Sequence, residues 1–456
     1  MQKWDVIIVG TGPAGIFATL RLSEDQNIKI LLLEKGKKLD ERTRKDVLFG
    51  WGGSGAFSDG KLTLSSAVGG WLLDYIPLDT FNQYMKRVED QYVAYGGNRS
   101  RLLEPNGKEI ENLKREAFKN GLQLIPFRIL HLGTDGLKKI LGGMFNDLSK
   151  RPNVDMMFET SVEELLAENG HIQGVKLEDG RKIYADNIIV ACGRVGSSWF
   201  RDELQRLKVS VQTRQVDIGV RVEIPAEISA PLTDLLYEFK LIFYSPTFDQ
   251  HVRTFCVCPN GEVALERGKD IITVNGHTYA DPARKTNNTN FALLVSTNFT
   301  TPFNEPFKYG KAISSLANLL SDNKVIIQRL ADLKGGRRST PNRLERSIIV
   351  PTCKEAIPGD LSFVLPYRHL VSILEMLEAL DSIIPGINSN NTFLYGVETK
   401  FYSNRLTLTN KFEIKGLRGL YAVGDGAGVT RSLAHASLNG LLVAEAILNN
   451  FQKTVD

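Results

Sequence analysis

The feature that most constrains the fold of this chain is a glycine-rich turn between an apolar strand and a helix, close to the first residue. Residues 5–9 end in four consecutive β-branched residues, which is typical of a strand buried on both faces. The glycines of a Gly-x-Gly-x-x-Gly pattern follow at 10, 12 and 15, and residues 16–23 read as a helix. The first glycine permits a tight turn, the second lets backbone approach a pyrophosphate, and the third lets the helix pack on the strand.

A second apolar strand over 27–33 completes a βαβ unit and ends at Glu34. A carboxylate at this place accepts hydrogen bonds from the hydroxyls of an adenosine ribose, and its charge disfavours a 2′-phosphate. The helix N-terminus offers backbone amides to the diphosphate. A purely structural glycine turn is the alternative. We predict a dinucleotide site that includes Gly10, Gly12, Pro13, Ala14, Gly15, Glu34 and Lys35.

Composition excludes several classes of protein. The 456 residues are 42% hydrophobic and 24% charged, as in ordinary globular proteins. Lys and Arg exceed Asp and Glu by 56 − 52 = 4, and no basic run is interleaved with aromatics, so we expect no nucleic-acid partner. We find neither a signal peptide nor the ~18 apolar residues of a membrane span, which favours a cytoplasmic protein without a membrane partner. We find no metal-ligand spacing, and four cysteines do not make a disulfide framework.

Glycines are concentrated again between residues 50 and 60, where a regular helix would be destabilised by about 1 kcal/mol for each of them. A loop this rich in glycine lets its backbone come close to another group. We therefore expect cofactor contacts in this loop at Gly53, Ser54, Ser58 and Asp59.

A further glycine turn, Gly424-Asp425-Gly426, follows a strand near the other end of the chain and precedes a helix expected over 433–449. With this turn the sequence resembles FAD enzymes of the glutathione-reductase-like two-dinucleotide class. The resemblance implies that Asp425 contacts the ribityl chain of FAD. It also implies that backbone amides of residues 428–433 lie near flavin O2, where they would stabilise negative charge on the reduced ring. The set of contacts implied by this resemblance comprises Val162, Cys192, Gly193, Gly424, Asp425, Ser432 and Leu433. Arg194, which follows Cys192-Gly193, is a further candidate contact that could either neutralise phosphate or pair with an acid.

A narrower resemblance extends across almost the whole chain. The segments 52–62, 131–135, 255–261, 275–277 and 396–400 are similar, in order, to landmarks of a little-characterised prokaryotic family of FAD-dependent dehydrogenase-like proteins. Asn260 stands where that family usually has Gly, and Lys400 where it usually has Arg. The resemblance implies bound FAD and an oxidoreductase role, without a substrate.

The predicted fold class is α/β. We expect a Rossmann-type FAD-binding domain, with a parallel sheet and a three-stranded antiparallel meander, which is completed by both chain ends and carries an inserted α+β substrate domain. The expected boundaries are 1–200 with a helical excursion about 67–121, then 201–391, then 392–456. A helix is expected over 136–149, with Thr134 and Asp135 as its cap.

Two side chains are candidates for catalysis. Cys258, next to Pro259, could act as acid or nucleophile if its pKa is lowered. His435 could donate a proton near the flavin. The alternatives are a small buried hydrophobe for Cys258 and a structural helix histidine for His435. The spacing of Cys256 and Cys258 excludes a Cys-x-x-Cys disulfide-reductase pair.

These observations lead to three functional hypotheses. The first is an oxidoreductase that uses non-covalently bound FAD for hydride transfer to or from a small molecule. Because no second dinucleotide motif follows a strand, NAD(P)H would visit only transiently as a donor. The second is a flavin-dependent C=C reductase or hydroxylase fed by NAD(P)H. The third is an FAD-binding RNA-modification or regulatory protein in which FAD is structural.

Overall fold

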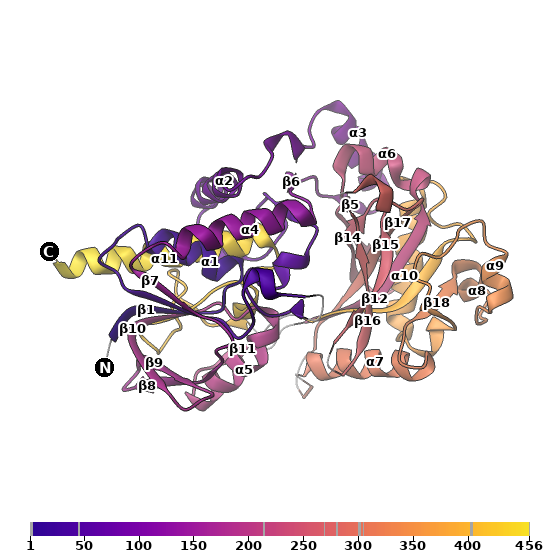
Figure 1. The fold of residues 1–456 in the computed structure, drawn as a ribbon. Coiled ribbons are helices and arrows are strands. Elements are labelled where there is room, and N and C mark those ends of the chain that lie inside the picture. Colours follow the sequence, from indigo (N-terminus) through magenta and orange to yellow (C-terminus); the bar gives the residue numbers. More distant parts are fainter. Residues whose placement is uncertain are drawn as a thin grey trace. The chain divides into compact units, whose positions relative to one another are not determined.

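Two β-sheets, each with its own hydrophobic core, organise the chain (Figure 1). The computed structural model describes residues 3–43, 46–212, 215–268, 270–279, 281–299, 302–303, 305–401 and 405–455. It divides into unit 1 (1–102, 128–214 and 402–456) and unit 2 (103–127 and 215–401). Unit 1 is therefore assembled from three separate stretches of sequence.

The main sheet of unit 1 has seven strands. Its order is β7-β2-β1-β10-β9-β8, with β22 also paired to β10. The pairs among β7, β2, β1, β10 and β22 are parallel, whereas β8, β9 and β10 form an antiparallel meander. The strands are β1 (Lys3–Val9), β2 (Ile30–Leu33), β7 (Val154–Met157), β8 (Val162–Glu168), β9 (His171–Leu177), β10 (Lys182–Val190) and β22 (Leu420–Ala422). The predicted α/β class, with its parallel sheet and antiparallel meander, is confirmed.

Helices from distant parts of the sequence accompany this sheet. Gly440 of α11 lies so close to α1 that an added Cβ would be 2.1 Å from the Ala14 carbonyl oxygen. This close approach is possible only for glycine, and it joins the last helix to the first. The helices of unit 1 are α1 (Pro13–Leu22), α2 (Leu78–Ala94), α4 (Thr134–Leu148), α5 (Gly193–Arg206) and α11 (Leu433–Val455).

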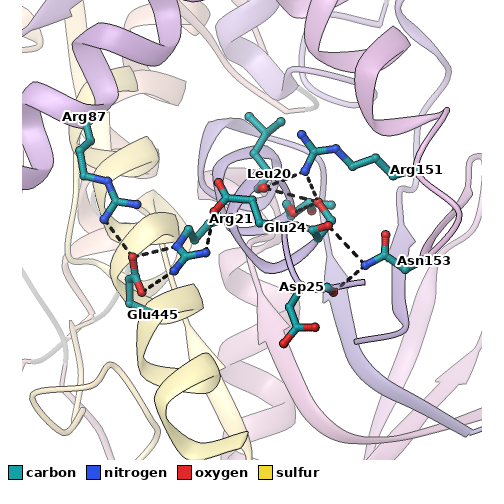
Figure 2. A network of polar contacts seen from close by, with 10 residues as sticks. Leu20, Arg21, Glu24, Asp25, Arg87, Arg151, Asn153 and Glu445 are labelled. Atoms are coloured by element: carbon teal, nitrogen blue, oxygen red, sulfur yellow. Dashed lines mark hydrogen bonds and ion pairs between the residues drawn. The ribbon is translucent and has the colours of Figure 1, made fainter. Parts of the chain in front are cut away.

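A network of ion pairs links three of these helices (Figure 2). The Glu445 carboxylate of α11 accepts from Arg21 Nε of α1 at 2.8 Å and from Arg87 Nη1 of α2 at 2.9 Å. Nearby, Arg151 donates to the Leu20 carbonyl at 3.0 Å, at the end of α1. The network orients α1, whose first turn is part of the site described below.

The sheet of unit 2 has eight strands in the order β19-β18-β20-β12-β17-β14-β13-β5, and a separate hairpin, β15-β16. The strands are β5 (Leu122–Leu124), β12 (Val216–Pro225), β13 (Leu241–Ser245), β14 (Gln250–Cys258), β15 (Glu262–Arg267), β16 (Ile272–His277), β17 (Asn288–Thr297), β18 (Ile326–Arg329), β19 (Ile357–Pro358) and β20 (Phe393–Phe401). Its helices are α3 (Lys108–Lys119), α6 (Ala226–Leu236), α7 (Pro306–Leu320), α8 (Leu330–Lys334), α9 (Pro341–Glu345) and α10 (Tyr367–Asp381).

The two faces of the unit 2 sheet differ in chemistry, as β12 shows. Alternate residues from Val216 to Ile224 join the hydrophobic core of unit 2. The residues between them point to the opposite face and include Asp217, Arg221 and Glu223, all with no exposed surface. Because charged side chains are rarely buried without partners, this face carries a set of internal ion pairs.

The unit boundaries differ from those expected from the sequence. The expected boundary at 200/201 lies inside α5, and the one at 391/392 precedes β20, which hydrogen bonds to β12 and β18 within the unit 2 sheet. Residues 103–127 belong to unit 2 because β5 pairs with β13.

The expected helix cap was also wrong: α4 begins at Thr134 after Gly133, and no side chain caps it. In the described part of the chain, no helix has the length and apolarity to cross a bilayer.

Candidate functional site

The three glycines of the first turn have three different structural roles. Gly10 has a φ of +103°, and a Cβ there would lie 2.5 Å from the Ala191 carbonyl oxygen. A Cβ on Gly15 would lie 2.1 Å from the Gly10 carbonyl oxygen. A Cβ on Gly12 would meet nothing within 4 Å. Gly10 and Gly15 are therefore required by packing, whereas Gly12 borders open space.

That open space lies at the N-terminus of α1. Gly12 is the N-cap residue, Pro13 follows, and neither a capping side chain nor an acidic residue lies in the first turn. The first amides of a helix lack intrahelical partners, and the helix dipole makes this end attractive to an anion. The geometry therefore fits the pyrophosphate of a dinucleotide.

Glu34 holds the surrounding loops together in this structure. Its Oε2 accepts from the Thr11 amide at 2.9 Å and from Thr11 Oγ1 at 2.8 Å. Its Oε1 accepts from the Gly36 and Gly50 amides, both at 2.8 Å. A carboxylate offers about four acceptor positions, so a ribose hydroxyl would share or displace one of these donors. The predicted ribose contact stays a prediction.

The glycine-rich loop packs against the first turn. The Gly52 amide donates to the Thr11 carbonyl at 2.8 Å, and a Cβ on Gly53 would lie 3.2 Å from Gly12 Cα. The buried guanidinium of Arg42 fastens this loop by donating to the carbonyls of Trp51, Asp46, Val47 and Gly53. Burial lowers the pKa of Arg42 to about 10, despite the nearby carboxylates of Glu34 and Asp46, so the side chain stays charged at neutral pH.

The second glycine turn meets the end of β10. A Cβ on Gly426 would lie 2.7 Å from the Gly193 carbonyl oxygen and 3.0 Å from Cys192 Sγ. The Asp425 carboxylate lies 3.6 Å from Arg194 Nε and accepts from Thr430 Oγ1 at 2.8 Å. Burial raises the pKa of Asp425, and the Arg194 charge and the Thr430 hydrogen bond offset only part of that effect. Burial also raises the pKa of the Cys192 thiol to about 12, so Cys192 is not a thiolate.

The segment before α11 has fewer free amides than the sequence suggested. The Arg431 amide donates to the Gly69 carbonyl at 2.8 Å, and Gly70 and Thr430 form an antiparallel bridge. Ser432 Oγ accepts from the His435 amide at 3.2 Å, as an N-cap residue does. Leu433 lies against the glycine-rich loop, 2.6 Å from the position of a Cβ on Gly55.

The other predicted contacts vary in their surroundings. Ser58 Oγ donates to the Gly55 carbonyl and Asp59 pairs with Lys61 at 3.3 Å, so both are engaged within their own loop. Ser54 is exposed, and Lys35 is exposed with its ammonium 4.0 Å from Glu178. Val162 begins β8, two residues after Thr160, whose amide donates to the Glu34 carbonyl at 2.8 Å.

The structure does not support His435 as a proton donor. Its Nε2 donates to the Ser65 carbonyl at 2.8 Å, its ring lies 5.1 Å from that of Phe81, and only 1% of the residue is exposed. Burial lowers its pKa to about 4, more than the hydrogen bond to Ser65 raises it. The imidazole is therefore neutral at pH 7 and serves the packing of α11.

Cys258 also differs from its predicted role. It belongs to unit 2, it is 1% exposed, and its Sγ lies 3.5 Å from both Arg221 Nη2 and the Cys256 carbonyl oxygen. A side chain this enclosed does not offer its sulfur to a substrate. The neighbouring Cys256 is partly exposed.

Several residues of the site were not predicted from the sequence. Thr11, Arg42 and Thr430 each bond to a predicted residue or loop, and Asn439 of α11 accepts from the Gly424 amide at 2.8 Å. Thr11 lies within the glycine motif, so its side chain could have been considered. Arg42, Thr430 and Asn439 give no local signal in the sequence. Their hydrogen-bond partners either lie far away along the chain or come within reach only through the path that a loop takes.

Two protein-family sequence models match parts of this chain, and both agree with a dinucleotide site at the two glycine turns. Residues 235–401 match the sequence model of the family described as "FAD-dependent protein, C-terminal domain-like", and residues 138–217 match that of glucose inhibited division protein A. An uncharacterized protein of Clostridium beijerinckii is 26% identical, over 98% of this chain and 81% of that protein.

The chain is also similar to several solved structures. Glycine oxidase from Geobacillus kaustophilus is 13% identical with a TM-score of 0.42, covering 98% of this chain and 95% of that one. L-proline dehydrogenase from P. horikoshii is 12% identical with a TM-score of 0.43, covering 98% and 94%. Together, the two family matches and the parallel sheet with its two glycine turns indicate that FAD is the cofactor of this chain.

Proposed function

We propose that unit 1 binds FAD non-covalently along a line from the N-terminus of α1 to the turn at Asp425, and that the bound flavin transfers a hydride to or from a small molecule. The observation that carries the first part is the pairing of an open helix N-terminus at Gly12 with a carboxylate at Asp425. The two features match the two chemically distinct parts of the cofactor, an anionic diphosphate and a neutral polyol.

Each residue would have a defined role. The first amides of α1 would bind the pyrophosphate oxygens, while Gly12 would leave room for them. The Asp425 carboxylate would accept a ribityl hydroxyl, and Thr430 would hold that carboxylate in place through its hydrogen bond. Arg194 would neutralise phosphate charge, since its guanidinium is half exposed beside Asp425.

When bound, FAD supplies the hydride chemistry, and the protein supplies orientation and charge. The α11 N-terminus would place partial positive charge near the flavin, through the amides that follow Ser432. His435 would only support that helix, because its hydrogen bond to Ser65 occupies the protonated nitrogen.

A direct experiment is anaerobic titration of the purified yellow protein with NADH and NADPH, followed at the flavin absorption maximum. Bleaching at catalytic rates would support a reductase fed by NAD(P)H. Bleaching only by small-molecule substrates would support a dehydrogenase. A protein that releases no FAD on denaturation and cannot be reconstituted with it would contradict the proposal.

A further inference from the structure

An arginine stacked on a tryptophan lies between the second glycine turn and α11. The guanidinium carbon of Arg431 is 3.9 Å from the centroid of the Trp71 ring. Both residues are half-buried. The negative face of an indole ring attracts a cation, and more strongly where water is partly excluded. The stacking therefore fixes a positive charge at this place.

Backbone hydrogen bonds hold the two stacked residues in register. The Arg431 amide donates to the Gly69 carbonyl at 2.8 Å, and the Trp71 amide donates to the Val429 carbonyl at 2.9 Å. These bonds flank the antiparallel bridge between residues 70 and 430. Successive residues of an extended segment point to opposite faces, so Trp71 and Arg431, each one residue from the bridge, lie on the same face. The stack is therefore set by the backbone as well as by the side chains.

The close approach of the two segments depends on a glycine. Gly70 has a φ of +144°, and an added Cβ would lie 2.5 Å from the Val429 carbonyl oxygen. A larger residue would push the two segments apart and move the Trp71 ring away from the guanidinium. The glycine thus brings the indole to the place where it supports Arg431.

Arg431 lies next to residues that we propose to surround FAD. The preceding residue, Thr430, donates to the Asp425 carboxylate at 2.8 Å, and the following residue, Ser432, is placed as the N-cap of α11. Burial raises the pKa of Asp425, and the charges of Arg194 and Arg431 act against that rise. The guanidinium of Arg431 is therefore close enough to influence the carboxylate at the turn.

The balance of charge around this turn favours an anion. Two guanidiniums, those of Arg194 and Arg431, act on the single carboxylate of Asp425. The first turn of α11 contains no acidic residue, and the N-terminus of a helix attracts negative charge. Because we assign the FAD diphosphate to α1 and Arg194, that group does not require Arg431. The charge of Arg431 suits a second anion.

The chemistry of the stack indicates which anion fits. An arginine side chain presents its N–H donors in a planar fork that matches the two oxygens of a carboxylate, and it can do so while one face rests on an aromatic ring. Since Trp71 covers one face of the guanidinium, a ligand would bind at the edge. The indole also offers an apolar surface to the carbon atoms of a small ligand, as in most binding pockets.

We propose that Arg431, stacked on Trp71, binds a carboxylate of the substrate, so that the substrates are small carboxylic acids. This inference rests on the proposed function, in which the flavin lies near the N-terminus of α11. A substrate held by its carboxylate would present a neighbouring C–H bond to the flavin in one orientation. No bond of the carboxylate itself forms or breaks.

The test titrates the oxidised holoprotein with acetate, succinate and benzoate as probes and follows the absorption spectrum of the bound flavin. At least one carboxylate should change the spectrum in a saturable way, whereas acetamide and benzamide, which carry no charge, should not. Arg431→Met should weaken binding of the tightest probe about tenfold, because the charge and the paired hydrogen bonds are lost. Arg431→Lys keeps the charge without the planar fork and should restore only part of the affinity.

Arg181→Met is the matched control. The Arg181 side chain is 58% exposed and pairs with Asp179 at 2.7 Å, so this variant should bind the probes like the wild type. All variants should retain FAD, and far-UV circular dichroism checks that each is folded.

The inference would be overturned if no carboxylate changed the spectrum of the wild type, if carboxylates and amides acted equally, or if folded Arg431→Met kept the wild-type affinity. In each of these cases the protein would still hold FAD, and the proposed function would stand. A wild type that binds no FAD would contradict the proposed function itself. The comparison of carboxylates with amides needs no variant, so it decides the question even if Arg431→Met fails to fold.

Discussion

The Asp425 carboxylate lies 3.6 Å from the Arg194 guanidinium, although 230 other residues separate them in the sequence. The two residues follow neighbouring parallel strands, β22 and β10, whose carboxyl ends meet at one edge of the sheet. In open α/β sheets, ligands bind at the carboxyl ends of the strands. The position of this pair therefore agrees with a cofactor site at that edge.

Arg194→Gln should weaken FAD binding about tenfold, because a positive charge near the diphosphate is lost. The free energy of unfolding of the apoprotein should change by no more than about 0.5 kcal/mol, because the Arg194 side chain is 55% exposed and solvent screens its charge. Fluorescence titration of deflavinated protein with FAD measures the first quantity, and urea unfolding measures the second. Unchanged affinity would assign Arg194 a role only as partner of Asp425.

Gly12→Ala and Gly15→Ala should separate binding from folding. A Cβ at Gly12 meets no atom within 4 Å, so the variant should unfold like the wild type but bind FAD at least tenfold more weakly, since the methyl group enters the space for the pyrophosphate. A Cβ at Gly15 would lie 2.1 Å from a backbone oxygen, so that variant should fold poorly. Thermal unfolding and FAD titration of both proteins check this prediction. Equal stability of the two variants would contradict it.

Glu445→Gln should lower stability without affecting FAD binding. The carboxylate pairs with Arg21 and Arg87 and is only 18% exposed, so the loss should be about 1 kcal/mol in urea unfolding. Burial raises the pKa of Glu445, but the hydrogen bonds from Arg21 and Arg87 outweigh it, so the pKa is lowered. The wild type should therefore lose this contribution as the pH falls below about 4.5, and the variant should lack that loss. A lower FAD affinity in the variant would contradict this assignment.

His435 should make the wild type less stable in acid. Its pKa is lowered from 6.5 to about 4 in the folded state, so the unfolded chain binds the proton more tightly. The free energy of unfolding should fall between pH 6.5 and 4 by on the order of 3 kcal/mol from this residue alone. His369, whose pKa burial also lowers to about 4, adds a similar effect.

The test compares urea unfolding of the wild type and His435→Gln across this pH range. The variant should show a smaller loss, and the pH dependence of flavin reduction should be the same in both proteins. A shift of the kinetic profile in His435→Gln would restore His435 as a proton donor.

Much of unit 1 could be predicted because its signals are local. The strand, glycine turn and helix around Gly12 lie within one continuous segment, and the turn at Asp425 repeats this pattern near the other end of the chain. The unit boundary was misplaced at β20, because an apolar strand does not show which sheet it joins. Likewise, Arg42 fastens a loop through four backbone carbonyls, and such contacts leave no pattern in the sequence.

The sequence predicted the candidate site best where the backbone of glycine turns forms it. The prediction was poorest for the side chains proposed to take part in catalysis. The sequence predicted a tight turn at Gly10 and close packing of helix on strand at Gly15, and the structure gives both residues close contacts that require glycine. Cys258 and His435 were chosen for their chemical type and for their place in the sequence, next to Pro259 and on the helix after the Gly-Asp turn. Both are buried and bonded to neighbours, and burial is a property of the assembled sheet and helices.

The most direct measurement is the affinity of deflavinated protein for FAD in the wild type, in Asp425→Ala and in Glu445→Gln as a matched carboxylate control. The account predicts one tightly bound FAD in the wild type, at least tenfold weaker binding in Asp425→Ala, and unchanged affinity in Glu445→Gln. Equal affinity of the wild type and Asp425→Ala, with both proteins folded, would contradict the placement of the cofactor at this turn.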